Sequence, residues 1–366
     1  MNASTQLILD DIFTAHKKSL EANWQLESDV QLKHLEFKKI IQQKTAQLES
    51  CEQLRILQEL EAWGPLEALK NDGEVTEILV NSPHEIIYEK KGELFFYDDH
   101  FYNEQTYNQC IERISQCCQG YMNKEIPFLE AQVDQMRITL IYKDIARGQH
   151  LISIRKQPQD AWTLEKLFAN GWCTGEQMQY LESMLLKRKN FLVIGGTSSG
   201  KTSVLQALLN HLPANQRVVS IEDTQELRVP NRLSTSLLTK TDPLNHQNDV
   251  TMNDLLKRAL RLRPDRLAVG EIRGAEATNL LMALATGHEG SCGTLHSRTA
   301  HEALLRLEML VQMGAPQWSL ESIRRLIGLT VQNILVVHRK NGVRQLEGIY
   351  EISSVEQTGI TLYKVV

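Results

Sequence analysis

The chain has 366 residues, a formal net charge of −5 and a hydrophobic fraction of 42%. This length predicts two domains plus an extension, and the nearly balanced charge argues against a general nucleic-acid-binding protein, which would carry a broad basic surface. No run of 18 apolar residues occurs, and the first residues lack a basic region followed by an apolar stretch, so we expect a cytoplasmic protein without a membrane span or signal peptide.

Residues 1–60 are rich in Gln, Glu, Lys and Leu and contain neither Gly nor Pro. Apolar side chains recur at helical spacing, as at Leu7, Ile8, Ile12 and Phe13. The sequence therefore predicts a helical extension. Such an arm packs as a coiled segment or docks a partner, and neither alternative gives it a catalytic role.

A small α+β domain is predicted over residues 61–157. Gly64 and Pro65 interrupt the helical pattern, and two short strands around a turn follow from Val75 onward. A helix is expected near residues 104–120, with later strands at 136–142 and 151–155. Pro158 breaks the pattern again, which indicates a linker over residues 158–163.

The rest of the chain, residues 164–366, alternates strands with helices. This order predicts an α/β domain with a largely parallel sheet covered on both faces, and a nucleotide would bind at the carboxyl ends of its strands. A final helix and two strand-like runs are expected to complete the sheet or form an appended subdomain. The expected strands lie at 191–194, 217–221, 267–269, 293–295, 330–337 and 346–352.

Residues 195–202 match the phosphate-loop pattern G-x-x-x-x-G-K-[ST] between an apolar strand and a helical segment. Glycines let the backbone wrap so that successive N–H groups face phosphate oxygens, while Lys201 reaches the β- and γ-phosphates and Thr202 binds Mg²⁺. A chance glycine-rich turn is the alternative, which the flanking strand and helix disfavour. The residues expected to contact ATP are Gly195, Gly196, Thr197, Ser198, Ser199, Gly200, Lys201, Thr202 and Ser203.

Acidic side chains follow two other predicted strands. Glu222, Asp223 and Glu226 come just after an apolar strand, where carboxylates orient water or Mg²⁺. Glu271 follows a short hydrophobic strand like a Walker B acid, although Gly270 and the choice of Glu over Asp are atypical. The alternative for Glu271 is a surface carboxylate at a strand end.

Two histidines, His288 and His296, flank a glycine-rich turn and the strand after it. A histidine at a strand end can contact a γ-phosphate, but each of them alone is more often a structural residue.

In their order and spacing these pieces resemble the secretion ATPase superfamily: a phosphate loop, an acidic box, an atypical Walker B segment and a histidine box. The match looks closest to the CpaF/TadA-like ATPases of tight-adherence pili and their type IV secretion relatives. Residues 64–67, 75–81, 261–274 and 287–297 carry the similarity to that branch. Because the six cysteines form no C-x-x-C pair, the chain does not resemble the type II secretion branch with its zinc-binding insertion.

The resemblance implies a homo-hexameric ring whose subunits each contain an N-terminal domain, a linker and a RecA-like P-loop ATPase domain, with ATP bound between the domains. It implies that Lys201 and Thr202 hold phosphate and Mg²⁺, and that Glu226 polarises the attacking water with assistance from Glu222. Glu271 would coordinate Mg²⁺ through water or share the role of base.

The resemblance also assigns His288 and His296 a role in relaying the nucleotide state. It places two arginines of the N-terminal domain, Arg137 and Arg155, at the γ-phosphate. The alternative is that both are exposed strand residues. Gln132 stands where the family pattern has a further arginine, so one phosphate contact is absent.

The expected function is an ATP-hydrolysing motor that drives pilus assembly or retraction, or protein secretion across the bacterial inner membrane. Membrane association would come through an inner-membrane platform protein, because the helical arm is short and weakly basic for a membrane-binding helix. Effector or DNA export by a type IV secretion system is the alternative within the family.

Two alternatives come from other classes. A RecA-like nucleic-acid translocase would use a basic helix with Lys257, Arg258, Arg261 and Arg263, although four such charges more often form a solvated or intersubunit face. A nucleotide-binding scaffold without turnover is disfavoured by the intact acidic boxes.

Overall fold

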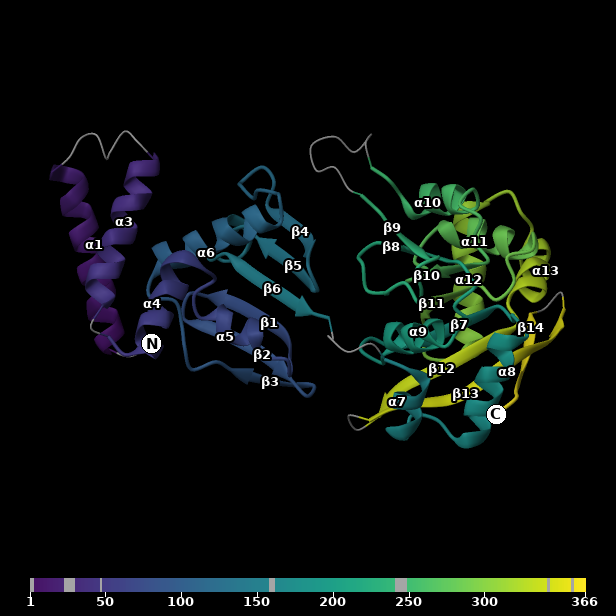
Figure 1. Cartoon of the computed structure of the whole chain (residues 1–366). Helices are drawn as coiled ribbons and strands as arrows, with labels where there is room; N and C mark the ends of the chain where they lie inside the picture. The colour runs from purple at the N-terminus through teal and green to yellow at the C-terminus, as the bar shows by residue number, and fades with distance from the viewer. Residues whose placement is uncertain are drawn as a thin grey trace. The chain divides into compact units, whose positions relative to one another are not determined.

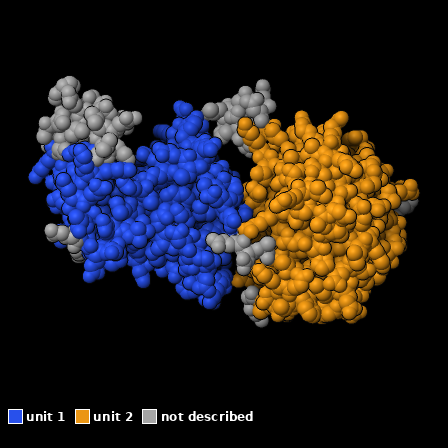
Figure 2. Space-filling model, viewed as in Figure 1, with its two compact units in different colours: residues 1–159 blue, residues 160–366 orange. Residues whose placement is uncertain are grey.

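The computed structural model describes residues 3–22, 30–46, 48–157, 162–240, 249–340, 343–356 and 359–366. The chain forms two compact units, Met1–Gln159 and Asp160–Val366 (Figure 2). Most of the linker predicted over 158–163 lies outside the described residues. Among those residues, no helix has both the length and the apolar character that crossing a membrane requires.

The first unit begins with a helical arm made of α1 (Ala3–Ala22), α3 (Val30–Thr45) and α4 (Ser50–Glu61) (Figure 1). The arm has a small apolar core of its own, to which all three helices contribute. Its buried members are Leu9, Ile12, Ile40, Ile41, Ile56 and Leu60. The helical extension expected from the sequence is therefore a packed bundle.

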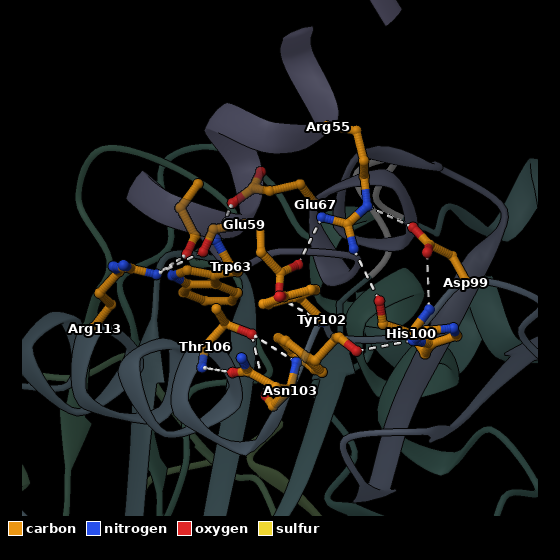
Figure 3. A network of polar contacts seen from close by, with 12 residues as sticks. Arg55, Glu59, Trp63, Glu67, Asp99, His100, Tyr102, Asn103, Thr106 and Arg113 are labelled. Carbon is orange, nitrogen blue, oxygen red and sulfur yellow. Dashed lines mark hydrogen bonds and ion pairs between the residues drawn. The ribbon is translucent and has the colours of Figure 1, made fainter. Parts of the chain in front are cut away.

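A polar network joins α4 to the rest of the unit (Figure 3). The side chain of Glu59 is buried and accepts hydrogen bonds from Arg55 at 2.7 Å and from the backbone N–H of Tyr102 at 2.8 Å. Arg55 also donates to Asp99 at 2.6 Å, and Arg113 donates to the backbone carbonyl of Ala62 at 2.8 Å. Charge-assisted hydrogen bonds are roughly twice as strong as neutral ones, so this network ties the last helix of the arm to the domain that follows it.

The remainder of the first unit is a six-stranded antiparallel sheet in the order β3-β2-β1-β6-β5-β4. Helices α5 (Leu66–Asn71) and α6 (Glu104–Cys117) contribute to the core on one face, where the alternate strand residues are apolar. The strands are β1 (Val75–Ser82), β2 (Glu85–Lys90), β3 (Glu93–Phe96), β4 (Phe128–Val133), β5 (Met136–Ile141) and β6 (Leu151–Lys156).

The second unit is built on an eight-stranded sheet in the order β14-β13-β12-β7-β11-β10-β8-β9. The six strands from β12 to β9 in this order run parallel, and β13 and β14 extend one edge as antiparallel strands. The strands are β7 (Phe191–Gly195), β8 (Val218–Glu222), β9 (Thr235–Leu238), β10 (Arg266–Val269), β11 (Cys292–His296), β12 (Asn333–Lys340), β13 (Val343–Val355) and β14 (Ile360–Lys364).

Helices cover both faces of this sheet (Figure 1). One face packs against α10 (Met252–Ala259), α11 (Glu276–Ala285), α12 (Ala300–Gly314) and α13 (Leu320–Thr330). The other packs against α7 (Leu164–Ala169), α8 (Gly175–Leu186) and α9 (Lys201–Asn210). Strands buried on both faces are largely apolar, as β7 is throughout and β10 is apart from the buried Arg266 at its start.

Candidate nucleotide-binding site

The phosphate loop connects the carboxyl end of β7 to the start of α9. Gly200 lies at the helix N-cap with φ +92°, a left-handed conformation that favours glycine. No side chain caps this helix, so the N–H groups of its first turn are left for an anion. Gly195 has no space for a side chain, because an added Cβ would collide with Ser199 and the carbonyl of Val337.

Lys201 is the first residue of α9, and the charges of Glu271, Glu226 and Arg273 act on it. Its Nζ donates to the carbonyl oxygens of Gly195 at 3.1 Å and Gly196 at 3.0 Å. Burial lowers the pKa of Lys201, and the negative charges of Glu271 and Glu226 oppose that shift. Two of the acids expected from the sequence therefore act electrostatically on the phosphate-loop lysine.

Glu271 follows β10 and pairs with an arginine that the sequence reasoning missed. Arg273 donates to Oε2 of Glu271 at 2.6 Å and lies 3.9 Å from the Asp223 carboxylate. Burial favours a higher pKa for Glu271, but the hydrogen bond from Arg273 and the charge of Lys201 overcome it, so that its pKa is lowered. Glu271 is thus held ionised. The signal was present in the sequence, since Arg273 lies only two residues from Glu271.

Glu222, to which the resemblance gave a role assisting Glu226, is the last residue of β8. Its side chain is buried, and Oε1 accepts hydrogen bonds from the backbone N–H groups of Glu226 and Leu227, both at 3.0 Å. Burial raises the pKa of Glu222 to about 7. Within the described residues its Oε2 has no hydrogen-bond partner. Glu222 therefore binds backbone, while Glu226 is half-buried on the following segment.

The two histidines lie near opposite ends of strand β11. His296 ends β11 on the same edge as the phosphate loop, where burial and then the charge of Lys201 lower its pKa, opposed by Glu271. His288 precedes β11 on the other edge, and its Nδ1 lies 3.0 Å from the carbonyl oxygen of Ala283. The five residues of β11 span roughly 13 Å. Of the two histidines, only His296 lies at the phosphate-loop end of β11.

The predicted arginines belong to the first unit. Arg137 on β5 and Arg155 on β6 are direct partners in the antiparallel register, on the face opposite the apolar core. Gln132 is the partner of Arg137 on β4, and Glu77 is the partner of Arg155 on β1. Like charges placed directly opposite each other are destabilising, but Arg155 also faces the carboxylate of Glu77 on its other side.

The basic helix expected around residues 257–263 is shorter than predicted. Helix α10 ends at Ala259, so Arg261 and Arg263 lie beyond it, and Arg263 has φ +54°. The Nη1 of Arg258 lies 3.7 Å from the carboxylate of Asp254 on the same helix. The four charges therefore do not form one continuous helical face for nucleic acid.

A second arginine that the sequence reasoning missed reaches the phosphate loop from β13. The Nε of Arg344 donates to the carbonyl of Ser198 at 3.3 Å. The sequence offers no signal for this contact, because the two residues are 146 positions apart.

Comparisons with known proteins agree with these motifs. The family described as "Type II/IV secretion system protein" matches residues 59–359. A protein of Mycobacterium tuberculosis whose name assigns it provisionally to conjugal transfer is 30% identical over 312 residues, covering 83% of this chain and 88% of that protein. Type IV secretion system protein PtlH of Bordetella pertussis is 28% identical over 303 residues, covering 74% of this chain and 87% of its own.

Two solved structures share the fold. The pilus retraction motor PilT with bound ADP aligns with a TM-score of 0.55 at 18% identity, covering 78% of this chain and 81% of that one. The ATPase DotB of Legionella pneumophila aligns with a TM-score of 0.54 at 16% identity, covering 78% of each chain.

Proposed function

Because the chain belongs to the type II/IV secretion system protein family, we propose that it is a Mg²⁺-dependent ATPase that works as a homo-hexameric motor for export across the bacterial inner membrane. The observation that carries the proposal is the phosphate loop at the uncapped start of α9, where Lys201 lies on the carbonyls of Gly195 and Gly196 and is acted on by the charges of Glu271 and Glu226. Cations and N–H groups at a helix start bind phosphates, and the acids beside them serve hydrolysis.

The phosphates of ATP lie along the loop, with Lys201 moving from the carbonyls of Gly195 and Gly196 to the β- and γ-phosphates. Thr202 and Glu271 are the residues that would hold Mg²⁺, whose charge offsets that of the phosphates. Glu226 orients the water that attacks the γ-phosphorus, which yields ADP and phosphate. His296 lies on the same edge and responds to the γ-phosphate.

In the assembled ring, Arg137 and Arg155 complete the site from the first unit, as arginine fingers do. Their direct pairing in the register supports this role, because it places two cations side by side on the sheet face opposite the apolar core. Gln132 beside Arg137 leaves the pair without a third arginine.

We expect Arg137→Ala and Arg155→Ala each to lower kcat by about 10²-fold, because each removes one charge that stabilises the developing phosphate charge. Steady-state ATP hydrolysis measures the effect, with Lys124→Ala as a control, since Lys124 is an exposed cation of the same unit. Unchanged turnover in both arginine variants would identify them as ordinary surface residues.

The transported material is a protein or a protein–DNA complex of a type IV secretion system. Relatives named for type IV secretion and conjugal transfer support this choice. Pilus assembly or retraction is the second candidate, supported by the motif resemblance to tight-adherence ATPases. The motor binds an inner-membrane platform protein from the cytoplasmic side, and this contact provides its membrane association.

Glu226→Gln tests the catalytic assignment. The amide retains the size of the side chain but cannot accept a proton from water, so we expect phosphate release to fall by 10²- to 10³-fold, about 3 to 4 kcal/mol, while ATP stays bound. Phosphate release and retention of labelled ATP measure the two effects. Glu289→Gln is the matched control, because Glu289 is an exposed acid on the loop before β11.

Two results would contradict the proposed function. One is wild-type protein that releases no phosphate from Mg-ATP, or releases it at the rate of Glu226→Gln. The other is strong stimulation of hydrolysis by single-stranded DNA, which would indicate a nucleic-acid translocase.

A further inference from the structure

The segment that carries Glu226 has no regular secondary structure, yet two buried side chains anchor its second half. It runs from Asp223 to Arg228, directly after β8. A catalytic side chain on an irregular segment needs such anchors, because its position is otherwise set by loop fluctuations.

The first anchor is the buried carboxyl group of Glu222. One oxygen, Oε1, accepts from the N–H groups of both Glu226 and Leu227 at 3.0 Å. Only 2% of Glu222 is exposed. The acceptor therefore fixes the backbone at Glu226 itself and lies out of reach of solvent.

The second anchor comes from the helix that begins at the phosphate loop. Gln206 on α9 accepts from the N–H of Arg228 at 2.6 Å and donates to the carbonyl of the same residue at 3.1 Å. Its Nε2 also donates to Asn210 at 2.8 Å, which holds the amide in this orientation. Gln206 is buried and lies five residues from Lys201 on the same helix.

Glu222 also contacts the segment that carries Glu271. A Cβ added to Gly270 would lie 2.8 Å from Cγ of Glu222 and 3.1 Å from Oε1. No side chain fits there, which accounts for glycine in place of the usual residue of the Walker B segment. The carboxyl group of Glu222 is thereby wedged between the backbone of residues 226–227 and Gly270.

We propose that Glu222 and Gln206 are positioning residues that together fix Glu226 relative to Lys201 and Glu271, and that Glu222 contacts neither the attacking water nor Mg²⁺. The inference rests on the proposed ATPase function. It replaces the assisting catalytic role that the sequence suggested for Glu222.

The chemistry of the two anchors determines how substitutions act. Glu222 holds the backbone through Oε1, which accepts both hydrogen bonds. The amide oxygen of a glutamine has the same geometry and can also accept them. Burial also favours the neutral carboxyl group, which an amide resembles. A methionine of similar length donates no hydrogen bond and accepts only weakly through its sulfur, so it loosens the backbone at residues 226–228.

We expect Glu222→Gln to keep kcat within about threefold of wild type, since the acceptor survives.

Glu222→Met and Gln206→Met should lower kcat on the order of 10²-fold, because a displacement near 1 Å has that effect on a reacting group. The KM for ATP and the affinity for a fluorescent ATP analogue should stay unchanged in all three. Gln312→Met is the control. Gln312 lies on α12 and donates to the carbonyl oxygens of Pro316 and Trp318, which follow the end of that helix.

Amide hydrogen exchange of residues 226–228 gives a readout that is independent of turnover. These amides should exchange faster in Glu222→Met and Gln206→Met, and at the wild-type rate in Glu222→Gln and Gln312→Met. Inactive Glu222→Gln would make Glu222 a catalytic acid or base, and full kcat or unchanged exchange in Gln206→Met would also overturn the inference. A wild-type protein without ATPase activity contradicts the proposed function instead, and the exchange measurement still tests the anchors.

Discussion

Lys201→Ala is expected to abolish ATP binding at ordinary concentrations and to lower turnover by about 10³-fold, near 4 kcal/mol. The loss is large because Lys201 is the cation of the phosphate loop, and its positive charge interacts with the negative charges of Glu271 and Glu226. Without it, those acids face the γ-phosphate of ATP with less opposing charge, and like charges repel strongly in a half-buried site.

The fold should survive this substitution. The two hydrogen bonds of Lys201 go to the carbonyls of Gly195 and Gly196, which water can solvate in the variant. Calorimetric titration with a non-hydrolysable ATP analogue measures binding, and the thermal unfolding midpoint reports the fold. Lys187→Ala, at an exposed position after α8, is the control. Analogue binding within threefold of wild type would overturn the assignment of the loop.

Arg266→Met is expected to destabilise the second unit by about 4 kcal/mol without touching the nucleotide edge. Arg266 is fully buried on β10, and its guanidinium donates to Gln216 at 2.6 Å, to the carbonyl of Leu185 at 2.8 Å and to that of Gly290 at 3.0 Å. Methionine fills the space of the aliphatic stem but leaves two buried carbonyl acceptors and the part-buried Gln216 without a donor, and each buried one costs about 1 to 3 kcal/mol.

Urea unfolding followed by circular dichroism, together with scanning calorimetry, measures this loss. Arg261→Met is the matched control, because Arg261 is exposed beyond α10. If Arg266→Met unfolds within 0.5 kcal/mol of wild type, roughly the range of a surface substitution, the three hydrogen bonds do not stabilise the unit. The same hydrogen bond to Gly290 holds the loop that carries His288, so a faster proteolytic cut in that loop should accompany the loss.

The buried strands of the second unit could be predicted from the sequence, and the edge strands could not. The runs expected at residues 191–194 and 267–269 lie within β7 and β10, because a strand covered on both faces is apolar throughout. Strand β9 (Thr235–Leu238) was missed, since half-exposed Thr and Ser give it no apolar run. Strand β14 at the other edge of this sheet was also missed, and so was the edge strand β3 of the first unit, although Leu94, Phe95 and Phe96 form an apolar run there.

The phosphate loop was the most predictable part of the candidate site, because its chemistry lies in contiguous residues. The roles of Glu222 and His288 were harder to predict, since they depend on which way β8 and β11 run and what covers them. Both residues flank apolar strands, yet one is buried against Gly270 and the other lies on the opposite edge. The two hydrogen bonds between Gln206 and Arg228 join positions 22 residues apart, and no local sequence pattern indicates them.

The hydrogen bonds of Arg55 and Glu59 determine how the helical arm is attached to the rest of its unit. Helix α1 has 20 residues, about 30 Å in length, and its Phe13 stacks on Tyr102 of the domain that carries the six-stranded sheet. Together with the polar network at its base, this stacking attaches the arm to that domain at more than one point. A displacement of α1 would therefore act first on Tyr102 and the segment around it, and through them on the domain that carries Arg137 and Arg155.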